Sequence, residues 1–252
     1  MDTLAEVARV VSTCTDCQLH AGRTNAVPGE GPDAAEILFI GEGPGFHEDR
    51  LGRPFVGPAG NFLEDLLQSI GMTRAQVYIA NMVKCRPPDN RDPVPTEIAA
   101  CSKYLDRQIE LLDPILIVTL GRFSTARFIP GQSISRARGR LRQVNGRHIF
   151  PIMHPAAGLR RQEMRAAIEE DFAKIPGLLD VLRIQSEPAS DSSQIREATP
   201  ALEPPPANQV PSLWDVPGPP ESGVATSPAD HPSADEIEKP DGPLPGQQRL
   251  FC

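Results

Sequence analysis

The sequence predicts a three-layer α/β/α fold with a central, mainly parallel four-stranded sheet. The first observation behind this prediction is a set of four short β-rich runs at residues 36–40, 77–81, 115–120 and 148–153. These runs are apolar almost throughout instead of alternating between polar and apolar residues. Such a pattern is typical of strands that are covered on both faces.

The second observation is the helical spacing of apolar residues between these runs. It extends over residues 4–11, 59–70, 96–112, 123–128 and 163–182. Pro95 is placed to begin a helix, and Gly71 and Pro114 are placed to end one. Strands that alternate with helices imply a parallel sheet with right-handed crossover connections.

The C-terminal part of the chain has a different composition. Residues 184–252 contain eleven acidic side chains against three basic ones, and 14 of the 28 prolines. With so few branched aliphatic residues, this part of the chain cannot bury enough apolar area to offset the chain entropy lost on folding. The sequence therefore predicts a folded domain over residues 1–183 and a disordered, Pro-rich acidic tail over residues 184–252.

We expect neither a membrane helix nor a leader segment. No apolar run approaches the roughly 20 residues that a membrane helix needs. The N-terminus, MDTLAEVARVV, lacks the basic start and the cleavage site of a signal peptide. We expect a soluble, intracellular protein.

One stretch of the predicted domain is strongly basic. Between residues 136 and 165 there are eight arginines and one acidic residue, Glu163. Such a run is often only a solvated face. However, the rest of the domain is acidic, and the planar guanidinium group pairs well with phosphate oxygens, so a phosphate-binding surface is favoured.

Polar residues follow three of the four predicted strands. Glu42 and Gly43 come after the first strand, Asn81 ends the second, and His154 follows the fourth. Each residue alone is weak support, because a strand-end Asn is usually a turn residue and a lone His is usually structural. In a parallel sheet, however, these strand ends lie at one edge, which is where such folds place their active sites.

The cysteines predict a metal site. Cys14 and Cys17 form a Cys-x-x-Cys pair, Cys85 and Cys101 have 15 residues between them, and Cys252 ends the chain. In an intracellular chain four such cysteines favour a metal over disulfides, although two buried thiols and a redox pair remain an alternative. Spacing does not separate zinc from an iron–sulfur cluster, because both accept four thiolates.

Three longer segments carry a resemblance: GEGPGFHEDRLGRPFVGPAG at 41–60, YIANMVKCRPPDNRDPVPTEIAAC at 78–101 and HPAAGLR at 154–160. With the four cysteines, they resemble the family 4 uracil-DNA glycosylases, the iron–sulfur class of bacteria and archaea. The resemblance implies one 4Fe-4S cluster on Cys14, Cys17, Cys85 and Cys101. It also implies base excision repair of uracil in DNA, in a monomeric, cytoplasmic and nucleoid-associated enzyme that leaves an abasic site.

Two alternatives to a turning-over enzyme are a covalent uracil-DNA-binding protein and a non-catalytic clamp adaptor with a structural metal. Covalent relatives trap their product with a histidine in the loop between the last two cysteines, and here that loop is short and has no histidine. An adaptor would not need Glu42, Asn81 and His154. We therefore expect turnover.

The resemblance and the chemistry of the reaction together suggest roles for the pocket residues. Phe55 is the stacking platform for the extruded base. The amide of Asn81 matches uracil N3–H and O4, while His154 donates to O2 as negative charge builds there. Glu42 orients the attacking water, and backbone amides near Gly43 add donors. Glu48 is expected where a 5-methyl group would fall, which would exclude thymine.

Other residues are expected to contact DNA or a partner. Leu159 is the candidate wedge that enters the vacated position in the duplex, although packing in the core is an almost equally favoured interpretation. The expected phosphate contacts are Arg138, Arg140 and Arg160.

The C-terminus suggests a partner. Gln247, Leu250 and Phe251 resemble the short peptide by which bacterial repair proteins dock onto the replication sliding clamp, although Gln248 departs from it. Leu213-Trp214 is a second candidate linear motif without a named partner.

Overall fold

The structure is a computed structural model that describes residues 1–186. These residues belong to one compact unit. Residues 187–252, which are all but the first three residues of the predicted tail, lie outside the described residues, and so do the Leu213-Trp214 segment and the proposed clamp peptide within them. The predictions made for them therefore stay predictions.

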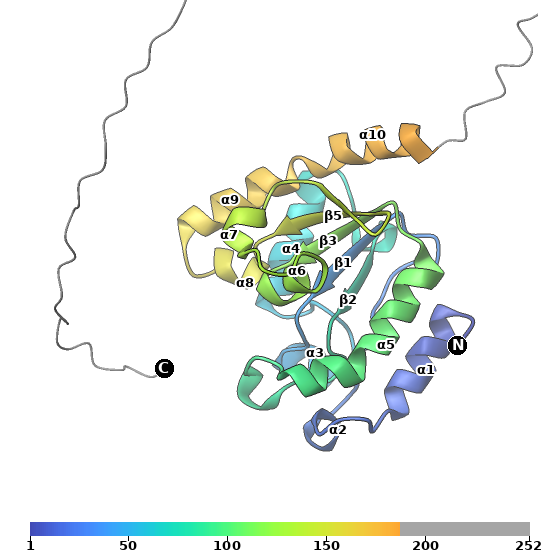
Figure 1. Cartoon of the computed structure of the whole chain (residues 1–252). Coiled ribbons are helices and arrows are strands. Elements are labelled where there is room, and N and C mark those ends of the chain that lie inside the picture. The colour runs from blue at the N-terminus through green and yellow to red at the C-terminus, as the bar shows by residue number, and fades with distance from the viewer. Residues whose placement is uncertain (187–252) are drawn as a thin grey trace, which may run out of the picture. The chain divides into compact units, whose positions relative to one another are not determined.

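The sheet has five strands in the order β2-β1-β3-β5-β4 (Figure 1). Their bounds are Ile37–Gly41 for β1, Tyr78–Asn81 for β2, Leu116–Leu120 for β3, Arg142–Val144 for β4 and Arg147–Ile152 for β5. The pairs β1–β2, β1–β3 and β3–β5 are parallel, and β4 pairs antiparallel with β5. The predicted parallel α/β sheet is confirmed, but the predicted number of four strands is wrong by one.

The strand that we missed is the short edge strand β4. Its residues are half-buried or exposed and polar, so it lacks the apolar character used to find the others. Asn145 and Gly146 connect it to β5 with φ of 49° and 78°. Positive φ at both positions is what a two-residue hairpin turn requires, and Asn-Gly is its usual sequence. The Asn145-Gly146 dipeptide is the sequence feature from which this hairpin, and so β4, could have been predicted.

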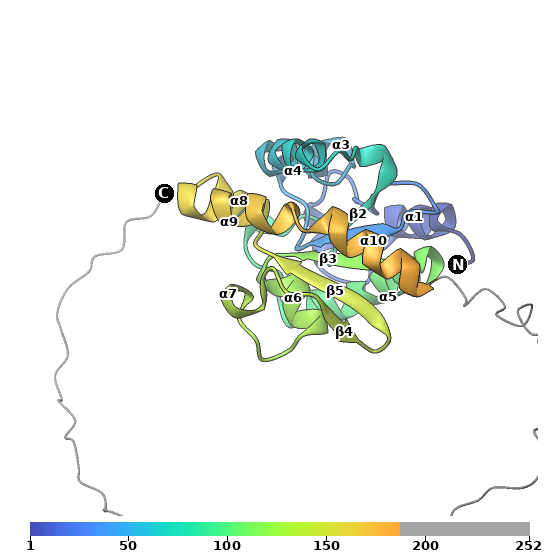
Figure 2. The ribbon, with the colours of Figure 1, turned by 90° about the horizontal axis from the view of Figure 1, so that it is seen from above.

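Helices cover both faces of the sheet (Figure 2). In β1, Ile37 and Phe39 pack into a core with helices α4 (Pro58–Ser69), α9 (Gln162–Phe172) and α10 (Ile175–Ser186). Leu38 and Ile40 point to the opposite face and pack into a second core that includes α5 (Pro95–Leu112). Because successive side chains of a strand point to opposite faces, one apolar run fills both cores.

The predicted helix over residues 163–182 is two helices. α9 ends at Phe172 and α10 begins at Ile175, with Pro176 in its first turn. Proline has no backbone N–H and is tolerated only in the first turn of a helix, so the chain must restart there. α10 continues to Ser186, beyond the domain boundary that we predicted after residue 183.

The remaining elements are mostly single turns. They are α2 (Leu19–Gly22), α3 (Phe46–Leu51), α7 (Ile134–Ala137), α8 (Pro155–Gly158) and the 3₁₀ turns η1 (Arg74–Gln76) and η2 (Pro88–Asn90). The longer α1 (Leu4–Thr13) and α6 (Arg122–Phe128) match their predicted ranges within two residues. Within residues 1–186, no helix combines the length and the apolar character needed to cross a membrane.

The outer edge of β2 is partly covered by the segment before β1. The backbone of Glu30 exchanges two hydrogen bonds with that of Ile79, at 2.9 and 2.8 Å. The Glu30 carboxylate also pairs with Arg53 at 2.6 Å and lies 4.0 Å from Arg74. This segment therefore contacts both β2 and the loop that follows α3.

Candidate active site

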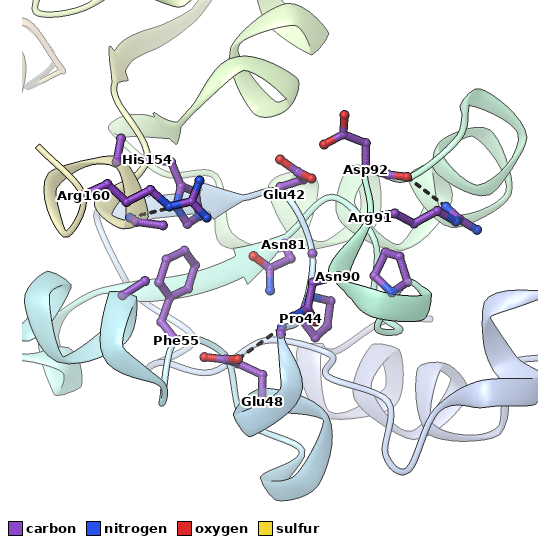
Figure 3. A pocket seen from close by; sticks show the side chains of 16 residues that line it. Glu42, Pro44, Glu48, Phe55, Asn81, Asn90, Arg91, Asp92, His154 and Arg160 are labelled. Carbon is purple, nitrogen blue, oxygen red and sulfur yellow. Dashed lines mark hydrogen bonds between the residues drawn. The ribbon is translucent and has the colours of Figure 1, made fainter. Parts of the chain in front are cut away.

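A cavity of about 450 Å³ opens at the carboxyl ends of the parallel strands. Glu42, Asn81 and His154, which lie at the ends of three different strands, all line it (Figure 3). Gly43, Glu48, Phe55 and Arg160 line it as well. The structure thus brings together every residue that the sequence suggested for catalysis or base binding.

Asn81 is the last residue of β2, and its side chain is buried. No group in the described chain donates a hydrogen bond to its Oδ1. Leaving a buried amide oxygen without a partner costs about 1–3 kcal/mol, so such an atom calls for an explanation. Because this atom faces the cavity (Figure 3), the explanation that fits is a donor on a bound ligand.

A buried lysine, Lys84, forms a hydrogen bond with the backbone of Asn81. The Lys84 ammonium donates to the Asn81 carbonyl at 2.9 Å and to Gln108 Oε1 at 2.6 Å. Gln108 in turn donates to the carbonyl of Pro28 and to the Tyr78 hydroxyl. This network fixes the end of β2, so the amide of Asn81 has a defined position in the cavity.

Phe55 reaches the cavity from a strained turn. Its φ is 50°, which is rare for a bulky residue, and its ring lies 5.6 Å from the His154 ring, at 27° to it. Arg74 donates to the carbonyls of Phe55 and Pro54, at 2.9 and 2.6 Å. The neighbouring Gly60 has no Cβ, and this allows the turn to approach α4.

Glu48 connects two segments at the edge of the cavity. Its carboxylate accepts hydrogen bonds from the backbone N–H groups of Gly45 at 3.1 Å and of Val56 and Gly57 at 2.9 Å each. It therefore ties the start of α3 to the turn that carries Phe55. Because Glu48 also lines the cavity, these bonds give its carboxylate a fixed position there, and the exclusion of thymine stays a prediction.

We predict that Gly60→Ala destabilises the protein by about 1–3 kcal/mol. A Cβ at Gly60 would lie 2.0 Å from the Phe55 carbonyl oxygen, so the turn has to move. Gly177→Ala is the matched control, because nothing lies within 4 Å of its Cβ and it is inside α10. The control should gain about 0.5–1 kcal/mol. Urea unfolding of both variants measures this, and equal stabilities would contradict the packing argument.

His154 is held as one neutral tautomer. Its Nδ1 accepts a hydrogen bond from the backbone N–H of Ala156 at 3.2 Å, at the start of α8. Burial lowers the pKa of His154 to about 4, against the opposing effect of the Glu48 charge. The proton of the neutral ring is therefore on Nε2, which makes this nitrogen a donor.

We predict that His154 stays neutral, with an unprotonated Nδ1, from pH 8 down to about pH 5. ¹⁵N NMR of histidine-labelled protein checks this. Because the folded pKa is below the ordinary value of 6.5, the unfolded chain binds more protons between about pH 6.5 and 4. His154 thus makes the protein less stable as the pH falls through this window. A His154 resonance that titrates near pH 6.5 would contradict the assignment.

Glu42 follows β1 and is half-buried. Burial raises the pKa of its carboxyl, nearby Asp92 raises it further, and Arg122 lowers it. Arg122 itself pairs with Asp92. A carboxylate with a raised pKa is a better proton acceptor for a bound water than an exposed one would be.

Sequence analysis missed the contribution of the loop between β2 and α5. Asn90, Arg91 and Asp92 line the cavity opposite His154 (Figure 3). Arg91 pairs at 2.7 Å with the buried Glu97 of α5, and this bond lowers the pKa of Glu97. The sequence analysis used this loop only to argue against covalent trapping, although its three consecutive polar residues could have indicated a contribution to the cavity.

The predicted DNA contacts separate into two groups. Arg160 lines the cavity, and the neighbouring Leu159 is 47% exposed, as a wedge would have to be. Arg140 is exposed but does not line the cavity. Arg138 is a correction: its Nε lies 2.8 Å from the carboxylate of the buried Asp171 and its other end donates to Ala167. Arg138 therefore neutralises a buried charge of α9, which does not fit a phosphate contact.

The four predicted metal ligands line one small, apolar cavity together with Val11 and Tyr104. Cys14 and Cys17 follow α1, while Cys85 follows β2 and Cys101 is on α5. Arg23 donates to the Cys85 sulfur at 3.1 Å, and the Lys84 N–H donates to that of Cys101 at 3.3 Å. In residues 1–186 no three side chains are arranged closely enough to hold a single metal ion, although the four thiols share this cavity.

Comparison with known proteins agrees with this site. Residues 28–175 match the uracil DNA glycosylase superfamily. A type-4 uracil-DNA glycosylase of Sulfurisphaera tokodaii is 49% identical over 69% of this chain and 84% of its own length. The chain belongs to this family. Type-4 enzymes of Archaeoglobus fulgidus and Thermotoga maritima are each 46% identical, over 69% and 67% of this chain and 92% and 90% of their own lengths.

The superfamily match contains every residue of the active-site cavity. It begins after Cys14 and Cys17, so it includes only two of the four cysteines. The type-4 relatives extend the similarity to 185 residues.

Proposed function

We propose that the protein is a uracil-DNA glycosylase of base excision repair, which hydrolyses the N-glycosidic bond of an extruded deoxyuridine and leaves an abasic site. The observation that carries the proposal is the buried Asn81 Oδ1, which has no hydrogen-bond partner in the described chain and faces a cavity also lined by Phe55 and His154. The type-4 relatives have the same named activity.

The acceptor and the donor of the Asn81 amide can distinguish uracil from cytosine. Its Oδ1 accepts from uracil N3–H, and its Nδ2 donates to uracil O4. Cytosine presents the reverse pattern at these two positions, an acceptor at N3 and an amino group at C4, so both contacts would be repulsive. The Phe55 ring offers a stacking face, which recovers about 1–3 kcal/mol of the cost of extrusion.

Stabilisation of the leaving group follows from the tautomer of His154. As the bond from C1′ to N1 breaks, its electron pair moves onto uracil, and negative charge develops at O2. The neutral imidazole donates its Nε2–H to this oxygen without first having to bind a proton. A preorganised donor of this kind is typically worth about 3–4 kcal/mol in the transition state.

Glu42 acts on the sugar side of the bond. A water molecule adds its oxygen to C1′ as uracil departs, and its proton passes to the Glu42 carboxylate, whose raised pKa favours this. The charge of the carboxylate also stabilises the cationic sugar. The uracil anion finally takes a proton from solvent.

The test is incubation with single- and double-stranded oligonucleotides that contain one uracil, followed by alkali. We expect strand breaks at uracil only. Asn81→Asp should weaken the preference for uracil over cytosine, because a carboxylate lacks the donor for O4 and accepts from the amino group of cytosine. Asn61→Asp, the same change at an exposed position of α4, should leave selectivity unaltered. Unchanged selectivity in Asn81→Asp would remove this residue from base reading.

We further propose that Cys14, Cys17, Cys85 and Cys101 hold a 4Fe-4S cluster. Four thiols in one apolar cavity, with N–H donors at two of the sulfurs, fit the thiolate set that such clusters use. When bound, the cluster supplies a covalent connection between α1, α5 and the end of β2. Because Lys84 precedes Cys85 and holds the Asn81 carbonyl, this connection also supports the base-reading residue.

We expect the purified protein to be brown and to contain iron and acid-labile sulfide in equal amounts. Cys85→Ser should lose most of the iron, whereas Cys252→Ser, which changes the remaining cysteine, should keep it. Metal analysis of the three proteins measures this. Zinc in place of iron, or full iron in Cys85→Ser, would contradict the proposal.

A further inference from the structure

Phe46, the first residue of α3, is a large aromatic side chain that the fold leaves 47% exposed. Two guanidinium groups lie near its ring, that of Arg50 at 5.6 Å and that of Arg86 at 5.3 Å from the ring centre. The imidazole of His47 meets the ring edge-on at 5.6 Å. The two arginines come from different segments, α3 and the loop after β2, so folding assembles this group.

Neither of these two arginines has an acidic partner in the part of the chain that the structure describes. Neither Arg50 nor Arg86 forms an ion pair within residues 1–186, in contrast to Arg53, Arg91 and Arg122, which all do. An arginine without a carboxylate partner retains its donors for an external anion, and the guanidinium group suits phosphate in particular. An exposed aromatic ring beside two such cations therefore matches the chemistry of a nucleotide.

The group formed by Phe46, Arg50 and Arg86 lies at the rim of the active-site cavity. Gly45, directly before Phe46, lines that cavity. On the other side, Arg86 donates from Nε to Asn90 Oδ1 at 2.7 Å, and Asn90 lines the cavity too. A DNA strand whose uracil lies in the cavity has to pass over its rim.

We propose that Phe46, Arg50 and Arg86 form a subsite that binds a nucleotide flanking the extruded uracil in single-stranded DNA. The base stacks on Phe46, and the arginines contact the adjoining phosphates. The occupant is single-stranded because only an unstacked base offers a free face, whereas both faces are covered in a duplex. This inference rests on the proposed function, since it takes the cavity to be the uracil site.

The first test measures binding without chemistry. Fluorescence anisotropy compares the full-length protein with Phe46→Leu, which retains apolar bulk but removes the aromatic face, on a labelled uracil-free oligothymidylate. We expect about tenfold weaker binding for Phe46→Leu. Leu51→Ala is the control, because Leu51 ends the same helix and is 63% exposed. Equal loss in both variants, or none in Phe46→Leu, overturns the proposal.

The second test locates the stacked base. In single strands with one uracil, the nucleotide on either side is replaced in turn by an abasic spacer, and KM and kcat are measured. One of the two spacers should raise KM of the wild-type protein about tenfold and leave KM of Phe46→Leu unchanged, with kcat within about twofold in each case. If the spacer raises KM of Phe46→Leu as much as it raises KM of the wild-type protein, the two effects are independent and the proposal is overturned.

The third test measures the contribution of the two arginines to DNA binding separately from that of the Phe46 ring. Arg50→Gln and Arg86→Gln should each reduce the slope of log Kd against log salt by about 0.7 on single strands. An unchanged slope in both variants would overturn the phosphate contacts. If the wild-type protein does not cleave uracil at all, the proposed function fails, whereas the anisotropy and salt measurements still decide whether the subsite binds single strands.

Discussion

The active site depends on the parallel pairing of β1 with β2, in a register that places Gly41 opposite Asn81. A Cβ at Gly41 would lie 2.4 Å from Asn81 Oδ1 and 2.7 Å from the Phe55 ring. The absence of a side chain at this one position lets both groups meet at the sheet edge. The same register puts Glu42 directly after that contact, so the acid, the amide and the aromatic ring are placed together.

The cysteine cavity and the active site share one short segment of chain. Between Asn81 and Cys85 there are only three residues, and the backbone of Val83 donates to the Glu42 carbonyl at 3.1 Å. A group bound by the thiols would thus fix the path of the chain that supports both the base-reading amide and the acid. This explains in physical terms how a site away from the substrate can be required for an ordered active site.

Much of this arrangement could be predicted from the sequence, because it depends on local patterns. Apolar runs marked the four long strands, and the rule that active sites lie at strand ends brought Glu42, Asn81 and His154 together. The edge strand β4 was missed because it is short and polar. The ion pair of Arg138 and the three hydrogen bonds of Glu48 were not predictable, since they depend on which distant segments the fold brings within reach. A basic run in a sequence does not show which of its arginines already have a buried partner.

Glu30 links two sides of the cleft that are far apart in the sequence. Its backbone is hydrogen-bonded to β2, the strand that ends in Asn81, and its carboxylate pairs with Arg53 and approaches Arg74, which holds the turn of Phe55. Glu30 therefore connects the side of the cleft that recognises the pyrimidine edge, which carries Asn81, to the side that stacks on its flat face, which carries Phe55. A nucleobase that leaves the helix enters a slot whose width is already set. Little of the binding energy has to be spent on rearranging the protein, and a base of the wrong shape cannot widen the slot to fit.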